Sequence, residues 1–144
     1  MGTVIFTYGT LQIPEVMRAI TGRPLKGRNS TLSGYGCYRL RGRVYPGITR
    51  EPGGVVHGTL YTDLGPDTLA RLDVFEDDLY ERIGVEVTAG NAVLPAEAYV
   101  IREDFRHELS RIPWDIDLFR QKYLARYLDG CRRFYHGASR IKGV

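Results

Sequence analysis

Residues that hold metals or cross-link chains are scarce in this sequence of 144 residues. Its 2 cysteines, Cys37 and Cys131, lie far apart, and no Cys-x-x-Cys pair occurs. The 3 histidines, His57, His107 and His136, are isolated, so no ligand pair has the spacing of a zinc site. We therefore expect no metal, and the sequence alone leaves open whether the two cysteines form a disulfide.

Long apolar segments are missing as well. No run approaches the roughly 20 residues that span a bilayer, and no secretory signal precedes the β-like segment from Thr3 to Tyr8. We expect a cytoplasmic protein without membrane contact, in which both thiols stay reduced.

The motifs of the common nucleotide-binding and hydrolytic folds are also absent. There is no Gly-x-Ser-x-Gly elbow and no Walker-type phosphate loop. Gly34-x-Gly36 is followed by Arg39 where a dinucleotide loop needs glycine, and no helical pattern follows. The sequence therefore predicts no nucleotide, redox or other cofactor.

Positive charge is in slight excess, with a net charge of +3. The nearest approach to a basic cluster is Arg39, Arg41 and Arg43, whose spacing of two places them on one side of an expected strand. A solvated sheet face is the favoured interpretation, and no nucleic-acid partner is expected. A weaker alternative is a nucleic-acid-binding barrel, because Tyr35 and Tyr38 lie nearby and could stack on bases.

The periodicity that is present predicts an α+β domain: a small mixed β-barrel with flanking helices and a long C-terminal helix. An apolar fraction of 43% and this length fit one core, so residues 1–136 are expected to form a single domain. The small, basic segment 137–144 is expected to be a flexible tail. Turn composition is found at 45–47 and 52–54. Strands are expected at 3–8, 26–43, 55–61, 80–88 and 96–101, and helices from about Pro14 to Gly22, from about Pro66, and over 115–135.

The last of these helices has the clearest pattern. Phe119, Tyr123 and Tyr127 recur every four residues, and Asp115 stands at the capping position. The spacing predicts one long amphipathic helix that lies across the sheet.

The first candidate site is Tyr8-Gly9-Thr10-Leu11, where the opening strand meets a helix. Backbone N–H groups at such a junction can form a nest for a carboxylate or phosphate. The alternative is a plain turn in which Gly9 supplies a positive φ.

The second candidate is Glu76, which follows Phe75 and stands four residues after Leu72, beside the apolar face of its helix. A carboxyl in the wall of a cavity can act as a general acid/base. The alternative is an ordinary acidic helix end, solvated together with Asp77 and Asp78.

Several motifs, taken in order, resemble those of the gamma-glutamylcyclotransferase superfamily, including its AIG2-like and gamma-glutamylamine branches. The resemblance covers roughly residues 3 to 101, and an ending with Trp114-Asp115 and one long helix is similar to the plant branch. The matching motifs are Tyr8-Gly9-Thr10-Leu11, Tyr45-Pro46-Gly47, Val56-His57-Gly58-Thr59-Leu60-Tyr61, Leu72-Asp73-x-Phe75-Glu76, Tyr80-x-Arg82, Val85-x-Val87 and Ala98-Tyr99-Val100.

The resemblance implies an activity: closure of a γ-glutamyl group to 5-oxoproline, with release of an amine or amino acid and without a cofactor. Glu76 would be the general acid/base, and the backbone of Gly9, Thr10 and Leu11 would hold the substrate's α-carboxylate. Tyr8 would shape the pocket. Further candidates for substrate contact are Tyr80, Arg82 and Tyr99.

The implied partner is a small γ-glutamyl compound, and the implied assembly is a monomer or weak homodimer. An alternative left open is a non-catalytic or differently specialised small-molecule-binding member of the same fold, because fold does not fix function.

Overall fold

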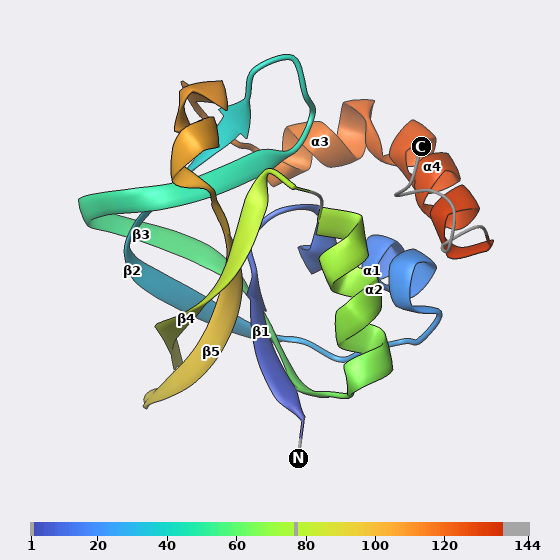
Figure 1. Ribbon diagram of the computed structural model, residues 1–144, viewed down its shortest axis with the longest axis horizontal. Helices are drawn as coiled ribbons and strands as arrows, with labels where there is room; N and C mark the ends of the chain where they lie inside the picture. The colour runs from blue at the N-terminus through green and yellow to red at the C-terminus, as the bar shows by residue number, and fades with distance from the viewer. Residues whose placement is uncertain (1, 77, 137–144) are drawn as a thin grey trace.

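The computed structural model describes residues 2–76 and 78–136 as a sheet with helices along one side (Figure 1). The predicted tail, 137–144, lies outside the described residues. Within the described ranges, no helix is both long and apolar enough to cross a bilayer.

Six strands form one sheet that closes on itself. The strand order is β3-β1-β5-β4-β2-β6, and β2 also pairs with β3, so five of the strands make a ring of hydrogen-bonded neighbours. β1 runs antiparallel to β3 and parallel to β5. This arrangement confirms the α+β class. The strands are β1 Thr3–Thr7, β2 Arg28–Leu40, β3 Pro46–Leu64, β4 Tyr80–Ala89, β5 Ala92–Ile101 and β6 Leu109–Pro113.

The first helix begins and ends at the residues that the sequence predicts. Pro14 opens the first helix, where a missing N–H leaves nothing unpaired. Gly22 ends it with a left-handed φ of 75°. The α-helices are α1 Pro14–Thr21, α2 Pro66–Glu76, α3 Ile116–Lys122 and α4 Leu124–His136, with short 3₁₀ turns at η1 Thr10–Gln12 and η2 Glu103–Glu108.

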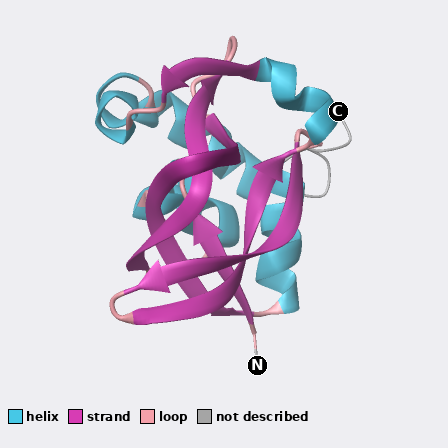
Figure 2. Ribbon diagram, turned by 90° about the vertical axis from the view of Figure 1, so that its left-hand side faces the viewer, coloured by secondary structure: helices cyan, strands magenta, loops and turns pink. Residues whose placement is uncertain are grey.

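Two apolar clusters stabilise this arrangement. One lies inside the ring of strands and includes Phe6, Leu32 and Val87. The other lies between the sheet and the helices and includes Met17 and Leu72. Figure 2 shows the helices flanking the closed sheet rather than passing through it. The region between sheet and helices is where the pocket described below is found.

The prediction of one long C-terminal helix is wrong, because the helix breaks at Tyr123 into α3 and α4. The predicted cap is confirmed: an Asp115 side-chain oxygen accepts the N–H groups of Asp117 at 2.9 Å and Leu118 at 3.2 Å. Tertiary packing accounts for the break, since no proline or glycine stands there. Phe119 of α3 packs against Trp114 before the break and against Tyr127 after it, and α4 also packs against α1.

The two turns predicted at 45–47 and 52–54 are also wrong in part. The long strand β3 begins at Pro46 and includes all of 52–54. The chain reverses instead at 41–45. Gly34 and Gly53, with φ of 85° and 80°, lie where the β2–β3 register shifts. Residues typical of turns are therefore accommodated at an irregularity within the strand pair.

The three clustered arginines do not share one side of a strand, because β2 ends at Leu40. Each guanidinium binds a protein acceptor. Arg39 Nε donates to the Arg43 carbonyl at 2.8 Å, and Arg41 Nε donates to the His107 carbonyl at 3.3 Å. Arg43 pairs with Glu108 at 2.9 Å. These contacts fasten the 41–45 turn to η2.

Candidate functional site

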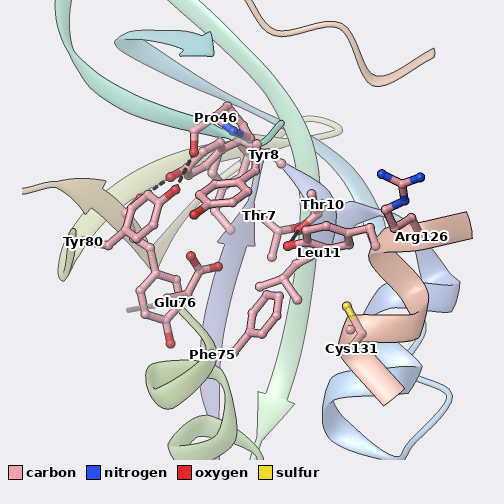
Figure 3. A pocket seen from close by; sticks show the side chains of 16 residues that line it. Thr7, Tyr8, Thr10, Leu11, Pro46, Phe75, Glu76, Tyr80, Arg126 and Cys131 are labelled. Carbon is pink, nitrogen blue, oxygen red and sulfur yellow. Dashed lines mark hydrogen bonds between the residues drawn. The ribbon is translucent and has the colours of Figure 1, made fainter. Parts of the chain in front are cut away.

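A pocket of about 320 Å³ lies where the end of β1, the start of β3, the end of α2 and one face of α4 meet (Figure 3). This volume is at the lower end of the range for small-molecule sites. Among the described residues, no three His, Cys, Asp or Glu side chains are grouped closely enough to hold a metal ion. The two cysteines are free thiols, and Cys131 lines the pocket.

The structure brings most of the sequence-predicted site residues together. All of them except Arg82 line this pocket, although they come from four separate segments of the chain. Those that do are Tyr8, Gly9, Thr10, Leu11, Glu76, Tyr80 and Tyr99.

Gly9 does not have the positive φ of the alternative interpretation, a plain turn. Its φ is −118° and its ψ −133°. The residue is small because the chain passes close to Pro46. A Cβ atom at this position would lie 3.0 Å from both Cγ and Cδ of the proline ring. Close approach of two segments, rather than turn handedness, therefore explains this glycine.

The bend after β1 begins the short 3₁₀ turn η1. In η1 the first backbone hydrogen bonds run from Gln12 N–H to the Gly9 carbonyl at 3.1 Å and from Ile13 N–H to the Thr10 carbonyl at 3.0 Å. The amides of Thr10 and Leu11 precede these donors, as at any helix start. The Gln12 side chain also donates to the Tyr8 carbonyl at 2.7 Å, which fixes the shape of the bend.

Glu76 ends α2 and is half-buried at the pocket wall. Figure 3 shows its carboxylate beside the rings of Tyr8 and Tyr80. Asp78 is exposed and does not line the pocket, so the acidic helix end is not uniformly solvated. Burial first, and the Glu76 charge second, raise the pKa of Tyr8. The charge of the carboxylate therefore acts on the groups that line this side of the pocket.

The hydroxyl groups of three buried tyrosines around Glu76 already donate hydrogen bonds to protein acceptors. Tyr8 donates to the Tyr99 carbonyl at 2.6 Å, and Tyr80 donates to the Pro46 carbonyl at 2.6 Å. Tyr99 donates to an Asp73 carboxylate oxygen at 2.5 Å. Burial is the largest cause that raises the pKa of Tyr80 and of Tyr99, so both stay neutral. Their oxygens keep free lone pairs, which makes this side of the pocket a hydrogen-bond acceptor.

Arg82, a sequence-predicted candidate for substrate contact, does not line this pocket. Its Nε and a terminal nitrogen bind the two Asp73 oxygens at 2.9 and 3.1 Å, and it also pairs with Glu97. Asp73 lies three residues before Glu76 on α2. The arginine therefore fastens α2 to β4 and β5 and reaches the pocket only through Asp73 and Tyr99.

Sequence reasoning missed the wall that α4 contributes. Arg126, Tyr127, Gly130 and Cys131 line the pocket, and the Tyr127 hydroxyl lies 3.1 Å from Thr10 Oγ1. The every-fourth-residue pattern indicated that Tyr127 would be buried but not what it would face. The one available signal was its hydroxyl, since a buried tyrosine usually has a polar partner.

Comparisons with known proteins agree with this architecture. A family model described as gamma-glutamyl cyclotransferase, AIG2-like, matches residues 5–115. AIG2-like protein C of Arabidopsis thaliana is 35% identical over 132 residues, which cover 90% of this chain and 76% of that protein. A solution structure of an Arabidopsis thaliana protein superposes with a TM-score of 0.69 at 27% identity, covering 99% of this chain and 87% of that one. A solved gamma-glutamyl cyclotransferase shares the fold, with a TM-score of 0.60 at 17% identity over 69% of this chain and 66% of its own.

Proposed function

The chain belongs to the gamma-glutamyl cyclotransferase, AIG2-like family, and we propose that it closes a γ-glutamyl group to 5-oxoproline and releases the attached amine or amino acid. One observation carries the proposal: Glu76 lines the same pocket as the amide-bearing bend at 9–11, although the two are far apart in sequence. Glu76 is proposed as the general acid/base, and the bend as the holder of the substrate's α-carboxylate.

The two sides of the pocket suit the two charges of an amino-acid head group. The bend offers the N–H groups of Thr10 and Leu11, which favour an anion. The opposite side offers the Glu76 carboxylate and the lone pairs of the Tyr8 and Tyr80 oxygens, which favour an ammonium group. A γ-glutamyl compound carries both an α-carboxylate and an α-ammonium, so it matches this polarity in one orientation.

Glu76 would move two protons in turn. The carboxylate takes the first from the α-ammonium, and the freed amine attacks the γ-carbonyl carbon, so that a new C–N bond closes the five-membered ring. Glu76 passes that proton to the nitrogen of the leaving group, and the old γ C–N bond breaks. The α-nitrogen gives up a second proton by the same route, so the products are 5-oxoproline and a protonated amine.

The physical demands of this reaction fit a pocket of this kind. The α-amine is mostly protonated at neutral pH and cannot attack until a base removes a proton. The nucleophile and the carbonyl belong to one molecule, so holding it folded lowers the barrier by several kcal/mol. A placed carboxylate typically adds about 10²–10⁴ in rate.

The test is formation of 5-oxoproline, measured by chromatography, from γ-glutamyl dipeptides and γ-glutamyl amines. The matched control is α-glutamyl-alanine, which has no amide at its γ-carbon and should give no product. Tight binding of the γ-glutamyl compounds without any 5-oxoproline would overturn the proposal and favour a binding protein of the same fold.

A further inference from the structure

The C-terminal helix contributes a wall of the pocket although it lies beyond the matched family region. That region ends at residue 115, and α4 spans Leu124–His136. The four lining positions of α4 are 126, 127, 130 and 131. This spacing is one face of an α-helix, so α4 presents a single continuous stripe to the pocket.

This stripe is fixed in place relative to the proposed catalytic groups. The Tyr127 hydroxyl meets Thr10 of the bend at 3.1 Å. Its ring packs against Phe75, with centroids 6.4 Å apart and an interplanar angle of 85°. Phe75 in turn packs against Phe134 at 5.5 Å. Because Phe75 directly precedes Glu76, the position of α4 is tied to both the bend and the acid.

Arg126 brings a positive charge to the rim of this wall. It is exposed, and among the described residues that line the pocket it is the only cation, as Glu76 is the only anion. Asp129, the nearest acid along α4, pairs with Arg132 at 3.6 Å. Within the described part of the chain, Arg126 takes part in no ion pair, so its guanidinium is available to a ligand.

The proposed reaction decides which part of a substrate reaches that rim. Ring closure brings the α-nitrogen onto the γ-carbon, so the γ-glutamyl part is compact and lies between the bend and Glu76. The leaving group is the part that extends outward. Figure 3 shows the Arg126 side chain on the opposite side of the pocket from Glu76, with its guanidinium turned toward the outside.

We propose that α4 selects the leaving group, and that Arg126 favours one that carries a carboxylate, such as an amino acid or peptide, over a cationic amine. A guanidinium binds a carboxylate with two parallel hydrogen bonds and repels an ammonium group. Gly130, four residues further along the same face, has no side chain, and a Cβ there would have, among the described residues, only the Arg133 side chain nearby, at 3.8 Å. This inference rests on the proposed cyclotransferase function.

Three substrates whose leaving groups carry different charges test the inference. They are γ-glutamyl-alanine with a carboxylate, γ-glutamyl-ethylamine with no charge, and γ-glutamyl-putrescine with an ammonium group. The wild-type KM should rise in that order. Arg126→Ala should reduce the ethylamine-to-alanine KM ratio about fivefold, the size of an exposed ion pair. Arg126→Glu should reverse the order of alanine and putrescine.

The matched control is Arg120→Ala, at an exposed arginine of α3 that pairs with Glu15 and does not line the pocket, and it should leave the KM ratios unchanged. Equal wild-type KM values would overturn the selection by charge. A rise in KM by the same factor for all three substrates in Arg126→Ala would also overturn it, because Arg126 would then bind the shared γ-glutamyl part.

Binding measurements separate failure of the inference from failure of the proposed function. Calorimetry on Glu76→Gln gives affinities for the three compounds without turnover. No 5-oxoproline from the wild type, together with an affinity order that depends on Arg126, would overturn the function and keep the selection. Turnover of all three substrates with KM values that do not depend on Arg126 would overturn the selection and keep the function.

Discussion

The wall of the pocket that carries Glu76 is held by directional polar bonds, whereas the α4 wall is held by packed rings. On the first, Tyr80 donates to Pro46 at 2.6 Å, and Arg82 grips both oxygens of Asp73. On the second, the Tyr127 ring meets Phe119 at 5.2 Å, and its one side-chain hydrogen bond, to a threonine hydroxyl, is longer at 3.1 Å.

The difference matches what each wall is proposed to do. A group that moves protons must be held within hydrogen-bond reach of its target, and bonds of fixed direction achieve that. A wall that selects among leaving groups needs the right shape and charge, which ring packing and one arginine can supply. Substitutions on the first wall should therefore affect rate and stability more strongly than equivalent ones on the second.

The largest effect expected is that of Glu76→Gln, which keeps the shape of the side chain but removes the base. The value of kcat/KM for 5-oxoproline formation should fall about 10²–10⁴-fold while circular dichroism stays that of the wild type. Glu81→Gln, at an exposed position of β4 outside the pocket, is the control. Undiminished turnover in Glu76→Gln would remove this residue from the mechanism.

Gly9→Val should follow, because a side chain here meets Pro46, whose carbonyl also accepts the Tyr80 bond. Forcing the bend and Pro46 apart should lower the free energy of unfolding by about 1–3 kcal/mol. It should also weaken binding of γ-glutamyl-alanine. Urea unfolding and calorimetry measure the two effects. Gly84→Val, in an open position of β4, is the matched control, and equal stability of the two variants would contradict the close approach.

A pair of Tyr→Phe substitutions compares the walls directly. Tyr80→Phe leaves the buried Pro46 carbonyl without its donor, and should lower the free energy of unfolding by about 1–3 kcal/mol. Tyr127→Phe keeps its ring contacts, and the Thr10 hydroxyl can rotate toward another partner, so we expect a loss below about 1 kcal/mol. Urea titration measures both. A larger loss for Tyr127→Phe would reverse the contrast between the walls.

Unfolding at alkaline pH tests whether water is excluded from both walls. Burial is the largest cause that raises the pKa of Tyr80 on one wall and of Tyr127 on the other. It also raises the pKa of Tyr61, which lies beneath the bend, to about 12. These phenols keep their protons in the folded state after the unfolded chain has lost them. Their contribution is therefore complete below roughly pH 10 and is lost as the pH rises above it.

Urea titrations between roughly pH 8 and 11 should show the free energy of unfolding falling by at most about 1 kcal/mol per pH unit for each such phenol. Tyr80→Phe and Tyr127→Phe should each flatten this fall. A variant whose profile stays parallel to the wild type would show that its phenol is already hydrated, and that wall would no longer count as dry.

Much of the polar wall could be predicted from sequence, because its residues belong to short motifs with local meaning. Glu76 follows Phe75 on an amphipathic helix, and Tyr8 to Leu11 follow a buried strand. Whether Arg82 lines the pocket could not be predicted, because a strand arginine can direct its long side chain to the pocket or to a neighbouring carboxylate. Only the positions of Asp73 and Glu97 decide between these.

The α4 wall could not be predicted in the same way. Periodicity showed which side of the helix is buried, but the partner of that side depends on the break at Tyr123, which no local residue indicates. The start of β3 was likewise concealed by Pro46 and Gly47, whose turn chemistry is overridden by pairing with β2. In both places tertiary contacts outweighed local preference.

The spacing of the pocket's contacts along the chain bears on how the protein is made. Tyr8 bonds to a carbonyl 91 residues later, and Thr10 meets a hydroxyl 117 residues later. Contacts of such sequence separation form late and slowly, after the entropy of long loops has been lost. While α4 is still inside the ribosome, the nascent chain can form only the wall of the pocket that carries Glu76. The proposed binding of a substrate therefore has to wait until α4 has emerged and packed against the bend.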